Sequence, residues 1–362
     1  MFEPTSLSRP PRQSELYYWA DYVELMCLVD IDQHFSAERL ATLANFADDL
    51  MATSPDAQDG DSSDIVAALL GESVYAIDNS LNELLSLPTD IDDEDPDDAL
   101  PAAFGRESEL TDDRARWCGD IFELLRDRER ALGDRYPFRI DPRYARIELA
   151  TVTKEARAYI FYLCCSSLGT VPKSEMAKLT SLFELLSGKV LAHVLPATAE
   201  IDHYGTAGGR SNSRFSGSAH QRLTALAGEL RAQVLAPAKD FHPRDSGDNG
   251  LDIVAWIPML DGQKGVAAVF VQCACGRRWD GKQYEASYAR WKEFLHLTSA
   301  PINITCIPHY FRSVGEEWYA GSDVSGILID RLRALRFLPP AAITDEYETV
   351  IEAALSFRLD VN

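Results

Sequence analysis

Two pieces of sequence, GDNGLDIVAW at residues 247–256 and VFVQCACG at residues 269–276, decide how the rest of the chain is interpreted. The first piece is a Gly/Asn turn that leads into an apolar run, and Asp252 stands at the entrance of that run. The second piece is an apolar run with Gln272 near its exit. Turn residues beside short apolar runs predict two neighbouring strands. We therefore expect Asp252 and Gln272 to meet at one end of a sheet.

A carboxylate and an amide oxygen on adjacent strands can supply two ligands to a divalent metal ion such as Mg²⁺ or Mn²⁺. Asp252 also has a plainer interpretation, as an acid that caps the turn at the start of a strand. Side chains alternate along a strand, so Cys273 and Cys275 should point away from Gln272. For these two cysteines we expect packing in an apolar core rather than zinc binding.

The two pieces resemble the Mrr-like restriction endonucleases of the PD-(D/E)XK nuclease superfamily. The pattern of that family is a Gly-rich turn, an Asp that opens a strand, and then a Gln or Glu, any residue and a Lys on the next strand. Asp252 matches the Asp position, Gln272 matches the Gln/Glu position, and Ala274 stands where the pattern has Lys. The resemblance covers roughly residues 215–312, where we expect the family's element order of helix, two or three strands, helix and strand.

This resemblance implies a metal-dependent DNA endonuclease that hydrolyses phosphodiester bonds in bacterial defence against foreign DNA. Its metal, Mg²⁺ or Mn²⁺, would be held by Asp252 and Gln272, with Glu229 on the preceding helix as a further ligand. Lys282 would join Asp252 and Gln272 as a catalytic residue, because it can replace the missing strand Lys. Other residues compete for the roles of Glu229 and Lys282, namely His220 and Gln221 for the acid and Lys264, Arg277 and Arg278 for the cation.

The second interpretation is a nuclease fold without activity. Ala274 in the Lys position favours a chain that binds DNA without cutting it, or that docks onto a helicase or ATPase partner protein in a defence complex. No ATP-hydrolysis motif is visible in the sequence, so translocation along DNA would need another chain. A homodimer is also left open.

Charge is distributed unevenly along the chain. The formal net charge is −22, and residues 1–100 hold 23 acidic against 3 basic residues, whereas residues 201–300 hold 10 acidic against 12 basic residues. The excess negative charge therefore belongs to the N-terminal half, which should repel nucleic acid. The predicted nuclease part does not share this excess negative charge. Between prolines, residues 88–101 carry seven acids and predict a solvated loop.

A length of 362 residues with 46% apolar residues predicts two domains. Helical apolar periodicity in the first half, together with the fold that the resemblance implies for the second, predicts an α+β protein. An acidic, all-helical domain would span residues 1–195, a Gly/Ser-rich linker residues 196–217, and the nuclease domain residues 218–362. The nuclease domain would contain a central mixed sheet flanked by helices. Predicted helices cover residues 15–30, 36–51, 65–87, 110–132, 153–168, 173–191 and 218–235, and another should follow Gly276 with Tyr284, Tyr288, Trp291 and Leu295 on one stripe.

The sequence contains neither a membrane-spanning run nor an N-terminal apolar segment typical of a signal peptide. Its seven cysteines are an odd number scattered through apolar segments, which favours reduced thiols over a disulfide framework. We therefore expect a soluble, cytoplasmic protein.

Overall fold

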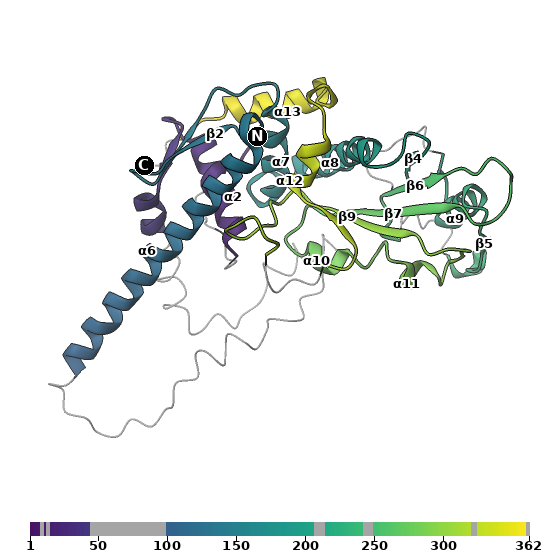
Figure 1. The fold of residues 1–362 in the computed structure, drawn as a ribbon, viewed down its shortest axis with the longest axis horizontal. Coiled ribbons are helices and arrows are strands. Elements are labelled where there is room, and N and C mark those ends of the chain that lie inside the picture. Colours follow the sequence, from purple (N-terminus) through teal and green to yellow (C-terminus); the bar gives the residue numbers. More distant parts are fainter. Residues whose placement is uncertain are drawn as a thin grey trace. The chain divides into compact units, whose positions relative to one another are not determined.

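The computed structural model describes residues 1–7, 11, 15–43, 99–205, 214–241, 249–319 and 324–359, without the side chains of residues 99–114 and 240. Met1–Leu40 and Cys118–Asn362 form one compact unit, and Ala41–Trp117 form a second (Figure 1). In the second unit the structure describes only residues 41–43 and the first part of one helix. No helix in the described ranges has both the length and the apolar composition needed to cross a membrane.

Helices and strands alternate along the described chain. The helices are α1 (Pro4–Leu7), α2 (Leu16–Val29), α6 (Ala99–Leu132), α7 (Arg157–Ser166), α8 (Lys173–Val194), α9 (Ala219–Glu229), α10 (Trp279–Lys282), α11 (Tyr288–Trp291), α12 (Arg331–Phe337) and α13 (Asp345–Ser356). The strands are β1 (His34–Ser36), β2 (Phe138–Asp141), β3 (Arg146–Leu149), β4 (Glu200–His203), β5 (Gln233–Val234), β6 (Ile253–Ile257), β7 (Ala267–Cys273), β8 (Leu295–His296), β9 (Ile302–Cys306) and β10 (Ile327–Ile329).

A five-stranded mixed sheet in the order β10-β9-β7-β6-β4 is the centre of the first unit. Strands β4, β6 and β7 form an antiparallel meander, and β9 and β10 continue it parallel to β7. Ile253, the first residue of β6, pairs with Val271. Asp252 and Gln272 therefore stand at the same end of adjacent strands, as the sequence predicted.

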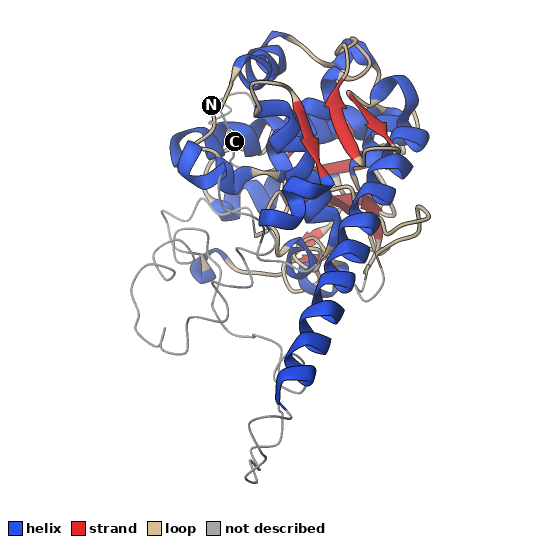
Figure 2. Ribbon diagram, turned by 90° about the vertical axis from the view of Figure 1, so that its left-hand side faces the viewer, coloured by secondary structure: helices blue, strands red, loops and turns tan. Residues whose placement is uncertain are grey.

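Both faces of this sheet are covered by helices (Figure 2). Val254 and Phe270 point to a cluster built with Leu226 of α9 and the fully buried Trp291 of α11. On the other face α8 packs against the sheet so closely that a Cβ at Gly188 would lie 3.9 Å from the Ile253 side chain. The mixed α/β architecture with a helix-flanked sheet agrees with the α+β class expected from the sequence.

The N-terminal half is not all-helical. Strands β1, β3 and β2 form a three-stranded antiparallel sheet, in which Phe138 and Ile147 are buried. These strands are only three or four residues long, and β1 lies more than 100 residues from its partner β3. Short strands with distant partners leave little periodic signal, so the sequence pattern did not reveal them.

The compact first unit extends across the linker expected at residues 196–217. Strand β4 lies inside that range and pairs with β6 from Glu200↔Trp256 to His203↔Ile253. Helix α8 precedes this linker and packs on the same sheet. The boundaries between the two compact units fall instead after Leu40 and before Cys118.

The helices predicted at residues 15–30, 110–132, 153–168 and 173–191 are confirmed as α2, α6, α7 and α8. The helix predicted at residues 218–235 is confirmed only as far as Glu229, the end of α9, because Gln233–Val234 form β5. The Ser36 hydroxyl oxygen accepts the backbone N–H of Arg39 at 3.3 Å, as expected of a helix N-cap. The helix predicted at residues 65–87 lies outside the described residues. The prediction of a single helix after Gly276 is wrong. The segment forms two short helices, α10 and α11, because Ser287 adopts extended backbone angles (φ −70°, ψ 150°). Leu295, expected on the same helix, belongs to β8.

A buried ion cluster of Asp21, Glu24, Arg128 and Arg331 joins α2, α6 and α12. Arg331 Nη2 lies 2.7 Å from Asp21 Oδ2, and Arg128 Nη1 lies 2.7 Å from Asp21 Oδ1 and 2.8 Å from Glu24 Oε2. The Tyr159 hydroxyl donates to Glu24 at 2.8 Å. Each residue of the cluster is at most 3% exposed. Two guanidinium groups thus balance two carboxylates in a buried site, which makes the cluster sensitive to loss of any one charge.

Candidate functional site

Asp252 is held by the ends of three strands. Its backbone N–H donates to Val271 at 3.0 Å, and its carbonyl accepts the N–H groups of Tyr204 at 2.8 Å and Gly205 at 3.0 Å. Its carboxylate Oδ2 accepts the backbone N–H of Cys273 at 2.6 Å. These bonds connect the residue to β4, β6 and β7 and fix where its other carboxylate oxygen points.

The turn before Asp252 requires glycine, as the sequence suggested. Gly250 has a φ of +75°, and a Cβ there would lie 2.5 Å from Glu285 Oε2. Asn249 precedes it with a φ of 55°, a conformation that asparagine tolerates better than most residues. The turn brings the chain directly against the segment that follows α10.

Glu184 of α8 supplies a second carboxylate, which sequence reasoning missed. A Cβ placed at Gly205 would lie 3.3 Å from Asp252 Oδ1 and 3.4 Å from Glu184 Oε1. Gly205 therefore leaves open a small space that both carboxylates border. The Glu184 side chain is only 4% exposed. Carboxylates that face a shared space, without a side chain between them, are an arrangement suited to a divalent cation.

His203 at the end of β4 also contacts Glu184. Its Nδ1 lies 3.3 Å from Glu184 Oε1. The imidazole fits tightly on α8, because a Cβ at Gly188 would lie only 3.1 Å from His203 Nε2. With a proton on Nδ1, His203 donates to Glu184 and orients its carboxylate toward Gly205.

Gln272 follows Val271, the pairing partner of Ile253, and so stands at the same end of the sheet as Asp252. The residue is 6% exposed. Its side-chain oxygen is buried without a hydrogen-bond partner among the described residues. A buried polar oxygen without a partner has an energetic cost, which a bound cation or water would remove.

Lys282 lies at the end of α10, half-buried. Burial raises the pKa of the Cys275 thiol, the negative charge of Asp252 raises it further, and the positive charge of Lys282 opposes this. The charges of Asp252 and Lys282, both assigned to the site from the sequence, thus act on the pKa of the same thiol. Ala274, at the Lys position of the motif, is 1% exposed, and its N–H donates to Cys306 at 2.9 Å.

Glu229 has a different environment from the one expected. It is the last residue of α9, and its carboxylate lies 3.5 Å from Arg214 Nη1 in an ion pair of which both side chains are partly exposed. The helix that brings an acid to Asp252 is α8, which precedes β4, rather than α9. Glu184 therefore takes the place for which the sequence suggested Glu229.

The residues present fit a hard divalent cation. Two carboxylate oxygens and one amide oxygen would come from Asp252, Glu184 and Gln272, and oxygen ligands of this kind suit Mg²⁺ or Mn²⁺. No group of three or more His, Cys, Asp or Glu side chains ready to hold a metal occurs in the part of the chain that the structure describes. The remaining ligands would therefore come from water or substrate oxygens, as is usual for Mg²⁺.

Gly205→Ala tests the space between the two carboxylates. The added methyl group would fill that space, and we expect it to weaken Mn²⁺ binding by about 10- to 100-fold, the usual range for altering the surroundings of a metal site. The measurement is the Mn²⁺-induced rise in melting temperature, together with the melting temperature of the metal-free protein. Gly228→Ala is the control, because nothing lies within 4 Å of a Cβ there. Wild-type Mn²⁺ stabilisation in Gly205→Ala would place the metal elsewhere.

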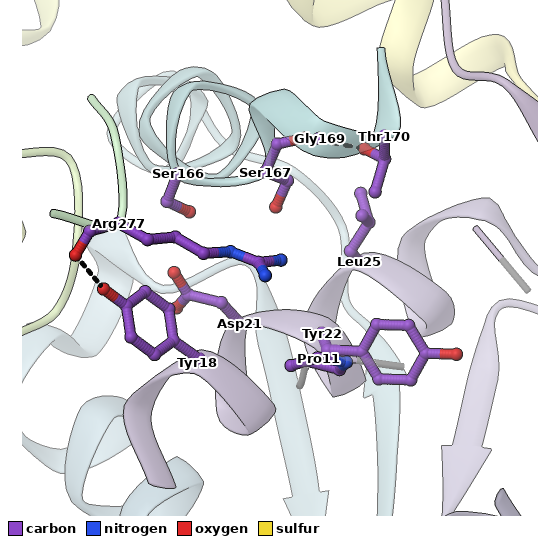
Figure 3. A pocket seen from close by; sticks show the side chains of 10 residues that line it. All are labelled: Pro11, Tyr18, Asp21, Tyr22, Leu25, Ser166, Ser167, Gly169, Thr170 and Arg277. Carbon is purple, nitrogen blue, oxygen red and sulfur yellow. Dashed lines mark hydrogen bonds between the residues drawn. The ribbon is translucent and has the colours of Figure 1, made fainter. Parts of the chain in front are cut away.

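A small pocket lies beside the loop that follows β7. Tyr18, Asp21, Ser166 and Arg277 are among its lining residues, and its volume is about 40 Å³ (Figure 3). The Tyr18 hydroxyl donates to the Arg277 carbonyl at 2.9 Å and connects this loop to α2. The volume suffices for a few water molecules but not for a nucleotide. We therefore assign the pocket no substrate.

Comparison of the chain with protein-family models, with curated proteins and with solved structures found no match.

Proposed function

We propose that this protein is a metal-dependent nuclease that hydrolyses DNA phosphodiester bonds. The observation that carries the proposal is the pair of carboxylates, Asp252 and Glu184, on either side of the space at Gly205. The buried, unpartnered oxygen of Gln272 supports it. The order of elements also supports it: without α9 and β5, which come between β4 and β6, and without α11 and β8, which come between α10 and β9, the order α8, β4, β6, β7, α10 and β9 follows the helix, strands, helix and strand of the PD-(D/E)XK superfamily.

In this proposal the metal supplies Lewis-acid activation of the phosphate and of the attacking water. Asp252 and Glu184 hold the metal, and Gln272 adds its amide oxygen. The Cys273 N–H fixes one oxygen of Asp252, and His203 orients Glu184, so both carboxylates are positioned before substrate arrives. Lys282 stabilises negative charge that develops on the attacked phosphate. Host defence against foreign DNA, with or without a helicase or ATPase partner, is the setting that the family resemblance suggests.

The direct test is cleavage of DNA by the purified full chain with Mg²⁺, with Mn²⁺, or with excess EDTA. We expect products only with the metals, because the site has carboxylates to hold a cation but lacks the strand Lys. Cleavage at full rate in EDTA would contradict the metal mechanism. A chain that binds Mn²⁺ at Asp252 yet cuts neither DNA nor RNA would contradict the nuclease assignment.

Lys282→Ala is expected to lower the cleavage rate by roughly 10²–10³-fold, the usual effect of removing one preorganised charge-stabilising group. Single-turnover cleavage measures this effect without interference from product release. Lys264→Ala removes an exposed cation from the β6–β7 hairpin and is the control. Lys282→Arg should retain part of the rate. Full activity of Lys282→Ala would exclude Lys282 from catalysis.

A second function has one specific observation in its favour. Ala274 occupies the position of the family's strand Lys, and its side chain is buried. A chain that binds DNA or a partner protein without cutting would not need that Lys. Retained DNA binding with no cleavage under any metal, in both wild type and Lys282→Ala, would favour this second function.

A further inference from the structure

The segment that follows β7 carries an unusual concentration of cations for so acidic a chain. Residues 276–293 contain five basic and three acidic residues, whereas the whole chain has a net charge of −22. The segment starts four residues after Gln272 and includes Lys282. Figure 1 shows its helices α10 and α11 along the same side of the five-stranded sheet. We define the α10–α11 surface as Lys282, Tyr284, Tyr288, Arg290 and Lys292.

Two tyrosines of this surface are exposed, although the sequence placed them on one stripe with Trp291 and Leu295, which are buried. Tyr284 is 48% and Tyr288 is 37% exposed. Neither ring contacts another aromatic ring or a cation within the described ranges, whereas most other tyrosines of this chain are buried. Each side chain therefore presents a substantial part of its surface to solvent.

The backbone beneath these rings is firmly held. The Ser287 hydroxyl donates to the Tyr284 carbonyl at 2.6 Å, and the Lys292 N–H donates to the Tyr288 carbonyl at 2.9 Å. Trp291 is fully buried, and its indole N–H donates to the Glu285 carbonyl at 3.0 Å. The tyrosines are thus presented by a rigid segment, so little conformational entropy is lost when a ligand binds.

Three cations accompany the rings. Lys282 is half-buried, and Arg290 and Lys292 are exposed. In the part of the chain that the structure describes, none of the three forms an ion pair, although Asp280, Glu285 and Glu293 are close in sequence. Unpaired cations in an acidic chain are complementary to an anionic ligand with repeated charges.

We propose that the α10–α11 surface binds single-stranded nucleic acid, with unpaired bases stacked on Tyr284 and Tyr288 and phosphates paired with Arg290 and Lys292. Exposed aromatic rings beside cations are the combination that single strands use, since bases in a duplex already stack on one another. The inference rests on the proposed nuclease function and specifies its substrate: a strand, or an unpaired end, that passes along this surface to Lys282 and the carboxylates.

The experiment measures binding of a fluorescein-labelled oligothymidylate and of a blunt duplex of equal length by anisotropy, with excess EDTA so that nothing is cut. We expect the single strand to bind at least about tenfold more tightly than the duplex. The double variant Tyr284→Ala, Tyr288→Ala should lose about 10- to 100-fold in affinity for the single strand. Tyr284→Phe with Tyr288→Phe should bind like wild type, because stacking needs the ring and not the hydroxyl.

Charge is tested separately. Arg290→Gln and Lys292→Gln should each reduce the slope of log affinity against log salt by about 0.7, the value for one phosphate contact on a single strand. For the tyrosine double variant, Tyr144→Ala is the matched control, because Tyr144 is 70% exposed on the β2–β3 turn. Unchanged single-strand binding in the tyrosine double variant, equal affinity for duplex, or equally effective competition by polyglutamate would each overturn the inference.

Failure of this inference can be told apart from failure of the proposed function. If Mg²⁺-dependent cleavage occurs but the tyrosine variants bind normally, only the strand-binding surface is wrong. If tyrosine-dependent binding is found but no metal supports cleavage, the surface stands and the nuclease assignment fails.

Discussion

Asp252→Ala is expected to lower metal-dependent DNA cleavage by roughly 10³-fold or more, because it removes a charged ligand from the proposed metal site. It also removes one of the two carboxylates, Asp252 and Glu184, that border the space at Gly205. Single-turnover cleavage at saturating Mg²⁺ measures the rate, and the Mn²⁺-induced rise in melting temperature reports metal binding independently of activity.

The alanine variant also loses the bond from the Cys273 N–H, so a folding defect must be separated from a lost ligand. Asp252→Asn keeps an oxygen to accept that N–H and removes the charge; it should fold like wild type and remain inactive. Asp261→Asn is the control. Its carboxylate accepts the Gln263 N–H at 2.9 Å in the exposed β6–β7 hairpin, and it should cut normally. An active Asp252→Asn would contradict the assignment.

The parts of the site that local sequence encodes were predicted, and those that depend on long-range packing were not. Asp252 directly precedes β6 and Gln272 lies on β7, and these two strands are consecutive in the sequence, so their position at one end of the sheet follows from adjacency in sequence. Glu184 comes close to Asp252 only because α8 packs on the sheet. Its one signal is an acid within the apolar run LFELL at residues 182–186, a position where an ionised side chain needs a reason to be buried.

The linker expected at residues 196–217 likewise shows what long-range packing hides from the sequence. Residues 196–217 read as a linker because glycine and serine dominate there, yet β4 lies within that range as the edge strand of the central sheet. Helix α2 was assigned to a separate N-terminal domain. Its buried acids instead pair with Arg331, about 310 residues away, and no local pattern reveals such a contact.

The buried ion cluster leads to the largest stability effect that we expect. Arg331→Met should lower the free energy of unfolding by about 3–5 kcal/mol, because among the described residues it leaves the buried Asp21 and Glu24 paired with Arg128 alone. Arg331 also donates to the Pro308 carbonyl at 2.8 Å and to the Ser166 hydroxyl at 2.7 Å, and both bonds would be lost. Urea unfolding at neutral pH measures the change.

Charge balance, rather than the loss of one side chain, is the cause that we assign to this effect. Arg331→Met combined with Asp21→Asn restores equal numbers of positive and negative charges, and should be more stable than Arg331→Met alone by at least about 1 kcal/mol. Arg146→Met is the control, because Arg146 pairs with Glu148 at a site where both side chains are 40% or more exposed, and such a pair contributes at most about 1 kcal/mol. If Arg331→Met costs no more than Arg146→Met, the cluster does not hold α2 and α12 together. If the double variant is less stable than Arg331→Met, lost hydrogen bonds rather than unbalanced charge explain the effect.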